Sequence, residues 1–223
     1  MSVSTWALVP LKSSERAKSR LAEVLDAEQR RRLFFSLAER VILALNESRN
    51  VDAVAVVTSS REVAAFAKLL HAVPIMQEAD VGMASALELA LQSLQTMQPG
   101  RVLMVPGDLP LITAHAVDAV FDAQPSGDHV VLVPDRRREG TNALLCSPPN
   151  VISPCFGIAS FARHLSAARA AGVVTTVAEI DELTLDLDCA DDLDYLRQRS
   201  KDFLAPLRPV ESSDVPLHAA LVG

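Results

Sequence analysis

Glycine is absent from the first third of this chain, since the first of its eight glycines is Gly82. Walker loops and dinucleotide-binding fingerprints both use glycines so that backbone amides can approach a phosphate. Neither motif is therefore present at the first predicted strand. A phosphate site near the N-terminus must instead be built mainly from side-chain cations.

The chain also has fewer basic than acidic residues. The 223 residues carry a formal net charge of -7, and the sequence pI is about 5.2. Proteins that bind nucleic acids or anionic membranes usually spread positive charge over a whole face. We therefore expect no nucleic-acid partner and no membrane partner, and any anion site must be local.

Cysteines and long apolar runs are few. The three cysteines, Cys146, Cys155 and Cys189, are odd in number and show no C-x-x-C spacing, so they predict neither a disulfide framework nor a zinc site. The N-terminal segment lacks a secretory pattern, and no apolar run approaches the roughly 18 residues that span a bilayer. These features predict a cytoplasmic protein.

Histidines in a catalytic arrangement are missing as well. The five histidines are scattered and fit neither nucleophile nor metal-ligand spacing. His164 lies one helical turn beyond Ser160, and we interpret it as a packing residue, with a position facing the anion pocket as the alternative.

Short β-branched runs alternate with segments of helical period. Strands are predicted over 5–10, 51–59, 72–78, 101–108, 129–135, 142–147, 172–180 and 183–188. Helices are predicted over 26–48, 60–70, 83–97, 113–123, 158–171 and 189–200, the first with Asp26 as its N-cap. This alternation favours an α/β fold with a mainly parallel sheet flanked by helices on both faces. We expect one domain over residues 1–200 and a C-terminal tail over 201–223.

Ligands in such folds bind beyond the carboxyl ends of the strands, so the residues that follow each strand are the candidates for chemistry. After the first strand come four cations, Lys12, Arg16, Lys18 and Arg20. This run predicts either a phosphate site made of side chains or a solvated basic turn.

Two acidic sites follow later strands. Asp108 ends the predicted strand 101–108 and either holds a cation or caps the next turn. Asp186 and Asp188 alternate along the predicted strand 183–188, so they point to one side and repel unless a cation lies between them. Mg²⁺ prefers one or two carboxylates plus phosphate oxygens. The alternative is that Asp188 or Asp191 caps the final helix.

A small-anion pocket is predicted from two further segments. Thr141 follows three arginines at a strand-to-strand crossing, and Gly157 stands at an expected helix start with Ser160 one turn in. Hydroxyls and helix N-terminal amides bind phosphate or carboxylate. The same residues are also compatible with a solvated turn and an ordinary helix start.

Five segments carry a resemblance to a known family. They are VPLKSSERAKSRL, PGDLPLI, DRRREGTNALL, FGIASFARHL and LDLDCADDL, in this order over residues 6–200. Together they resemble the 2-phospho-L-lactate or phosphoenolpyruvate guanylyltransferases of coenzyme F-420 biosynthesis. The resemblance implies a nucleotide-diphospho-sugar-transferase-like fold that transfers GMP from GTP to a phosphorylated three-carbon acid and releases pyrophosphate. The acid is phosphoenolpyruvate, 2-phospho-L-lactate or 3-phospho-D-glycerate.

The resemblance also implies roles and partners. Magnesium is the implied cofactor, and the product is implied to pass to a downstream deazaflavin transferase; a homodimer is one option that it leaves open. The implied sites are the magnesium ligands Asp108, Asp186 and Asp188, the acid contacts Thr141, Gly157 and Ser160, the catalytic cations Lys12, Lys18 and Arg20, and the GTP contacts formed by these cations with Arg16 and Gly82. The chain departs from the family pattern at Gly107, at Met83 and Ala84, and at Cys189.

The implied chemistry needs no general base, because a phosphate monoester has a second pKa of about 6 and is already anionic at neutral pH. The barrier is then electrostatic, since two anions must meet. Three alternatives remain open: a sugar-phosphate or molybdopterin nucleotidyltransferase, which usually has a glycine-rich first loop; a non-catalytic nucleotide-binding module; and, more distantly, a D-x-D-x-T phosphatase, whose acid pair follows the first strand.

Overall fold

The computed structural model describes residues 3–14, 18–79 and 82–200. Arg16 and the predicted tail lie outside these residues. The seven strands of the described part are β1 (Thr5–Pro10), β2 (Ala53–Thr58), β3 (Val73–Met76), β4 (Arg101–Met104), β5 (His129–Pro134), β6 (Thr141–Ser147) and β7 (Val174–Val177). The α-helices are α1 (Ala27–Glu47), α2 (Arg61–Leu69), α3 (Met83–Ser93), α4 (Ala114–Asp122), α5 (Ser160–Ala171) and α6 (Ala190–Arg199).

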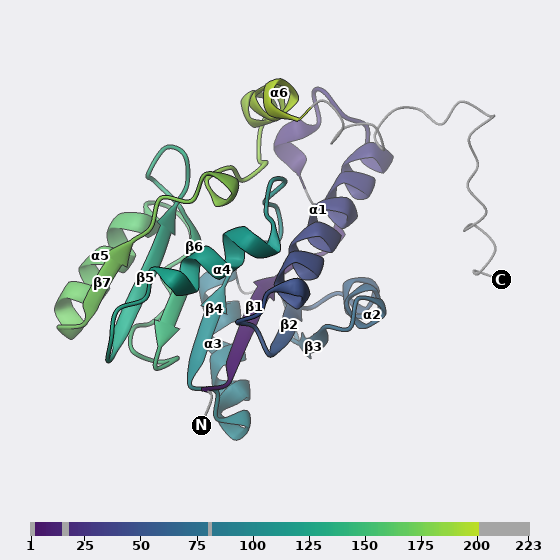
Figure 1. The fold of residues 1–223 in the computed structure, drawn as a ribbon. Coiled ribbons are helices and arrows are strands. Elements are labelled where there is room, and N and C mark those ends of the chain that lie inside the picture. Colours follow the sequence, from purple (N-terminus) through teal and green to yellow (C-terminus); the bar gives the residue numbers. More distant parts are fainter. Residues whose placement is uncertain (1–2, 15–17, 80–81, 201–223) are drawn as a thin grey trace.

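All seven strands form one sheet in the order β3-β2-β1-β4-β6-β5-β7. Strand β6 pairs antiparallel with β4 and β5, and the other pairings are parallel. Figure 1 shows this sheet with helices packed against it. The predicted α/β class with a mainly parallel sheet is confirmed.

The two faces of the sheet are buried under different helices. Val9 of β1 packs in one core cluster with residues of α1, α2 and α4, whereas its neighbour Leu8 packs in another with residues of α3 and α5. Successive side chains of a strand point to opposite faces, so a strand covered on both faces is apolar along its whole length. All six residues of β5 are buried, as this rule requires.

Helix α1 forms where the sequence predicts it. Asp26 is the N-cap and forms a capping box with Gln29. The apolar residues that recur every four positions, Leu33, Leu37, Val41 and Leu45, are all fully buried. One stripe of α1 therefore lies on the core along the length of the helix.

A third core cluster lies beyond the carboxyl ends of the strands. It joins Leu21 and Leu25, which follow β1, to α1, to α6 and to the segment that precedes α6. Leu185 and Leu187 are the members from that segment. Figure 1 shows α6 beyond this end of the sheet. This cluster brings the first loop and the last loop of the domain together.

The predicted eighth strand, 183–188, is wrong. Leu183 ends the 3-10 helix η4 (Asp181–Leu183), and residues 184–188 are not part of the sheet. Two isolated backbone hydrogen bonds join the segment to loops: Leu187 N–H donates to the Asp108 carbonyl, and Arg136 N–H donates to the Thr184 carbonyl. The segment crosses the ends of β4 and β5, so no strand runs alongside it to form a ladder.

Two of the boundaries that differ from the prediction affect the site. Strand β4 ends at Met104, so Asp108 lies in the following turn. Helix α5 begins at Ser160, because Gly157 and Ala159 before it have φ values of 115° and 52°. Ser160 is therefore the first residue of the helix, not one turn in. Within the described ranges, no helix has the length and apolarity needed to cross a membrane.

Candidate active site

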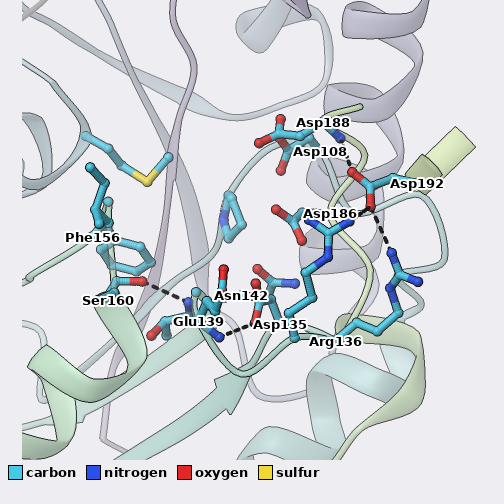
Figure 2. A pocket seen from close by; sticks show the side chains of 18 of the residues that line it. Asp108, Asp135, Arg136, Glu139, Asn142, Phe156, Ser160, Asp186, Asp188 and Asp192 are labelled. Atoms are coloured by element: carbon cyan, nitrogen blue, oxygen red, sulfur yellow. Dashed lines mark hydrogen bonds and ion pairs between the residues drawn. The ribbon is translucent and has the colours of Figure 1, made fainter. Parts of the chain in front are cut away.

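A cavity of about 470 Å³ lies beyond the carboxyl ends of the strands. Seven of the predicted site residues line it: Arg20, Asp108, Thr141, Gly157, Ser160, Asp186 and Asp188. Figure 2 shows the three aspartates on one side of this pocket and Ser160 on the other. Residues from five separate segments of the chain thus meet around one space, as expected for this edge of an α/β sheet.

The acidic side of the cavity is arranged around Lys18. Its Nζ lies 2.5 Å from Asp108 Oδ2 and 3.1 Å from Asp188 Oδ1, and its side chain is 7% exposed. Arg20 lies further out, 4.0 Å from Asp188 Oδ2. Burial lowers the pKa of Lys18, but the charges of Asp108 and Asp188 outweigh burial and raise it overall. Lys18 is therefore a charged ammonium between two carboxylates.

Asp186 and Asp188 line the same cavity although they are not in a strand. Their neighbours Leu185 and Leu187 are buried in the third core cluster. The extended segment therefore turns its leucines to the core and its acids to the cavity. Burial and then the charges of Asp108 and Asp188 raise the pKa of Asp186 to about 6.

The three aspartates meet some, but not all, of the requirements of a site for a divalent cation. Asp108 Oδ1 is buried without a hydrogen-bond partner among the described residues, which marks a place for a further cation or donor. Asp108 and Asp188 already converge on one positive charge. Two carboxylates completed by substrate phosphate oxygens are a donor set that Mg²⁺ uses. Within the described part of the chain, however, no three acids, histidines or cysteines are assembled as a ready-made metal site.

The acid that caps α6 is Asp192, a residue that the sequence analysis missed. Its Oδ2 accepts the backbone N–H groups of Asp188 and Cys189 at 3.1 and 3.0 Å, and it is buried. The alternative in which Asp188 or Asp191 caps this helix is therefore wrong. The signal was present, because a capping box places an acidic or amide side chain three residues after the N-cap. Asp188 therefore does not cap the helix, and it lines the cavity.

The arginine turn after β5 is exposed, as the solvated-turn alternative expects, but two of its arginines are also held by contacts. Arg136 donates to Asp192 Oδ1 at 3.0 Å and stacks over Tyr195 at 4.3 Å from the ring centre. Arg137 lies 3.4 Å from the same oxygen. Both arginines line the cavity. They add positive charge to the side that carries the three aspartates.

The opposite side of the cavity carries hydroxyls, a helix N-terminus and one carboxylate, that of Glu139. Thr141 N–H donates to Ser160 Oγ at 2.9 Å, and both residues are buried. No side chain caps the N-terminus of α5. Gly157 lines the cavity just before this helix. This side offers donors to an anion.

His164 stands behind these hydroxyls. It is fully buried, which agrees with the predicted packing role, and its ring lies edge-on to Phe156 with centroids 5.0 Å apart. It also contacts the cavity wall, since its Nδ1 lies 2.9 Å from Thr141 Oγ1.

Two predicted residues lie elsewhere. Lys12 and Gly82 line a separate pocket of about 30 Å³, and Met83 borders both pockets. Cys189, a position that departs from the family pattern, lines the main cavity. The described residues therefore place the small pocket next to the main cavity.

Residues 5–208 match a family model described as guanylyl transferase CofC like. The chain belongs to this guanylyltransferase family. It is 38% identical over 197 residues to a phosphoenolpyruvate guanylyltransferase of Conexibacter woesei, covering 88% of each chain. A relative of the same name from Sphaerobacter thermophilus is 39% identical, with 87% of this chain and 93% of the relative covered. A 2-phospho-L-lactate guanylyltransferase of Methanothermobacter thermautotrophicus is 32% identical, with 86% and 83% covered.

Solved structures support the fold of this guanylyltransferase. A nucleotide-diphospho-sugar transferase described as putative, from Desulfovibrio desulfuricans, superimposes with a TM-score of 0.72 at 15% identity, covering 89% of this chain and 88% of the other. A 4-diphosphocytidyl-2C-methyl-D-erythritol synthase gives 0.61 at 13% identity, covering 88% and 98%. The predicted nucleotide-diphospho-sugar-transferase-like fold is confirmed.

Proposed function

We propose that this guanylyltransferase transfers GMP from GTP to phosphoenolpyruvate or 2-phospho-L-lactate, as a step of coenzyme F-420 biosynthesis, and releases pyrophosphate. The names of the relatives supply the acids. The observation that carries the proposal is that one cavity has the three aspartates with their cations on one side and the hydroxyls of Thr141 and Ser160 on the other, with Asp135 and Glu139 also in its lining. Two different anionic groups would each meet a different side.

The side with the hydroxyls suits the phosphorylated acid. Thr141 and Ser160 present hydroxyls, and the uncapped start of α5 lies next to Gly157. The acid's phosphate oxygen would act as the nucleophile toward the α-phosphorus of GTP, with pyrophosphate leaving on the opposite side. Its charge at neutral pH makes a basic side chain unnecessary.

The side with the aspartates and cations suits the triphosphate. Lys18 and Arg20 would contact GTP phosphates, with Lys12 and Arg16 from the same loop. The small pocket beside Gly82 shares Met83 with the main cavity and would receive part of the nucleotide. Each close pair of like charges costs about 4 kcal/mol at an effective dielectric constant of 20. The cations of the loop would offset that repulsion by holding both anions in place.

Asp108, Asp186 and Asp188 would hold Mg²⁺. The buried, unpaired oxygen of Asp108 supports this assignment. When bound there, Mg²⁺ would neutralise charge on the reacting phosphates. Asp192 and Lys18 would keep Asp188 and Asp108 in position, through the contacts described above.

The proposal is tested by pyrophosphate release. Wild-type protein is mixed with Mg²⁺, GTP and one acid at a time: phosphoenolpyruvate, 2-phospho-L-lactate or 3-phospho-D-glycerate. The downstream transferase and its deazaflavin acceptor are included, because we expect an unstable anhydride product that must be passed on. Parallel reactions replace GTP by ATP or CTP, or the acid by a sugar 1-phosphate. We expect release only with GTP and a phosphorylated three-carbon acid.

Two variants make the assay specific to the site. Asp108→Asn should lower turnover by at least about a hundredfold, the effect of losing one transition-state charge contact. Asp194→Asn changes a carboxylate that is 63% exposed on α6 and should behave as wild type. Release that is independent of the acid, or normal turnover by Asp108→Asn, would contradict the proposal.

A further inference from the structure

The hydrogen bonds of His164 define which of its ring nitrogens carries a proton. Its Nε2 accepts the backbone N–H of Cys155 at 2.7 Å. A backbone N–H only donates, so Nε2 holds no proton. In a neutral imidazole the single proton is then on Nδ1, which lies 2.9 Å from Thr141 Oγ1. His164 therefore donates to the threonine hydroxyl.

The ring stays neutral at physiological pH. Burial, helped by the charge of Arg163, lowers the pKa of His164 to about 4. The residue is fully buried, so water does not compete for its two hydrogen bonds. Only the tautomer protonated at Nδ1 satisfies both neighbours, because in the other one Nδ1 could accept the threonine hydroxyl hydrogen but Nε2–H would face the N–H of Cys155.

The hydrogen bond donated by His164 determines whether Thr141 presents a hydrogen-bond donor or an acceptor to the cavity. Because Oγ1 of Thr141 accepts from the ring, the hydrogen of its own hydroxyl points elsewhere. Ser160 is in the same position, since its Oγ accepts the backbone N–H of Thr141. No acceptor among the described residues takes either hydroxyl hydrogen, and both residues line the cavity.

We propose that His164 is a positioning residue that directs the hydroxyl hydrogen of Thr141 into the cavity, so that Thr141 and Ser160 form a pair of donors for an anion. This inference rests on the proposed function, which takes that anion to be the phosphorylated acid. Ionised phosphate and carboxylate oxygens accept hydrogen bonds and form stronger ones than neutral hydroxyl oxygens, whereas an ammonium group only donates, so a pair of donors favours an anion.

The test uses two substitutions that separate the two hydrogen bonds of the ring. In His164→Asn the side-chain amide nitrogen takes the place of Nδ1 and keeps the donor to Thr141. In His164→Gln the side-chain oxygen takes the place of Nε2 and keeps the acceptor for Cys155, but Thr141 loses its donor. We expect His164→Gln to raise KM for the acid about tenfold, with kcat and the KM for GTP within about threefold of wild type. His164→Asn should show a smaller increase in the KM for the acid.

Thr141→Val provides the coupling test, because it removes the hydroxyl while keeping the shape of the side chain. If His164 acts through this hydroxyl, His164→Gln adds no further increase in the KM for the acid to Thr141→Val. Increases that multiply independently would overturn the proposal, and so would an equal rise in the KM for GTP. Thermal unfolding of each variant identifies any that fails to fold, in which case His164→Asn and Thr141→Val decide.

The tautomer is measured without any substrate. In ¹⁵N-labelled protein the two-bond imidazole spectrum distinguishes a ring protonated at Nδ1 from one protonated at Nε2, and the His164 signals are those lost in His164→Gln. A neutral ring protonated at Nδ1 from pH 6 to 8 supports the proposal, and a ring protonated at Nε2 overturns it. If wild type turns over no phosphorylated acid, the proposed function fails, and the positioning role is then decided by this spectrum.

Discussion

Lys18 Nζ lies 2.5 Å from Asp108 Oδ2, although the two residues are 90 positions apart in the chain. The same ammonium reaches Asp188, which lies just before the last helix. Lys18 has a left-handed backbone conformation, with φ of 55°, at the start of the 3-10 helix η2 (Ser19–Leu21). The first loop of the domain therefore supplies a cation to the acids that follow β4 and precede α6.

Lys18→Met should destabilise the protein most when divalent cations are removed. The substitution keeps the length of the side chain but leaves Asp108 and Asp188 facing each other, so we expect the free energy of unfolding in EDTA to fall by about 1–3 kcal/mol. Mg²⁺ no longer competes with the ammonium, so it should raise the Tm of the variant more than that of wild type. Thermal unfolding with EDTA and with MgCl₂ measures both effects. An equal Mg²⁺ shift in the two proteins would contradict the placement of the cation site.

Arg197→Met is the matched control for this substitution. Arg197 pairs with Asp194 on α6, and both side chains are more than half exposed. Exposed pairs contribute at most about 1 kcal/mol. This variant should unfold nearly as wild type does in EDTA, and its response to Mg²⁺ should be unchanged.

Asp186→Asn should stabilise the metal-free fold while removing activity. The pKa of Asp186 rises from 3.8 to about 6 in the folded protein. Between pH 3.8 and 6 the Asp186 carboxyl is protonated in the folded chain and ionised in the unfolded chain. The free energy of unfolding therefore falls as the pH rises from 3.8 to 6, and it stays at the lower value at neutral pH. Asparagine removes the charge, and we expect the free energy of unfolding at pH 7.5 in EDTA to rise by up to about 3 kcal/mol.

The comparison protein is Asp181→Asn, since the side chain of Asp181 is 83% exposed. Its Tm should equal that of wild type, whereas the Tm of Asp186→Asn should rise by about 2–4 °C for each kcal/mol gained. Pyrophosphate release should be lost only in Asp186→Asn. A lower Tm for Asp186→Asn would show that its charge is well compensated in the absence of metal.

The placement of Asp186 shows what sequence patterns can and cannot predict. Alternation of leucine and aspartate predicted that Asp186 and Asp188 share a side, and both line the cavity. The assignment to a strand was wrong, because alternation requires only an extended segment with one apolar side. Leu185 and Leu187 are buried by α1 and α6 instead of by a neighbouring strand.

Residues that act through other side chains were harder to predict. Asp108 lies in the turn after β4, Thr141 begins β6 and Ser160 begins α5, and such positions at the ends of elements suggest a site. His164 and Asp192 act through contacts with residues 23 and 56 positions away. These long-range contacts depend on how the loops pack, and the only local signal for either residue is the capping-box spacing of Asp192.

Asp192→Asn should weaken both the fold and the site. Its carboxylate accepts two backbone N–H groups, one of them from Asp188, and lies 3.0 Å from Arg136. In the variant, either the uncharged amide oxygen or the amide NH₂ group would face the arginines in place of a charged carboxylate oxygen. We therefore expect the free energy of unfolding to fall by about 1–3 kcal/mol. Turnover should fall by about tenfold as the turn that holds Asp188 loosens.

Asp191→Asn is the neighbouring control, because Asp191 is exposed whereas Asp192 is buried. Urea denaturation and pyrophosphate release of the two variants are compared with wild type. Asp191→Asn should match wild type in both measurements. If the two substitutions had equal effects, the charge of the helix N-terminus, and not the contacts of Asp192, would explain them.

Lowering the pH should reduce the free energy of unfolding of the wild-type protein, because His164 is buried as a neutral ring. Its pKa falls from 6.5 to about 4 on folding, so between these values the unfolded chain binds a proton that the folded chain excludes. The stabilisation is fully present above pH 6.5 and is lost as pH falls toward 4, by roughly 3 kcal/mol in all. His164→Gln lacks this group, so the variant should be less stable than wild type at pH 7.5, and the gap should close as pH falls. Urea denaturation of both proteins from pH 7.5 to 4 measures the gap directly, because the titrations of Asp186 and of the other histidines are common to both proteins and cancel. A gap that stays constant over this range would mean that the His164 ring gains a proton in the fold as readily as in the unfolded chain.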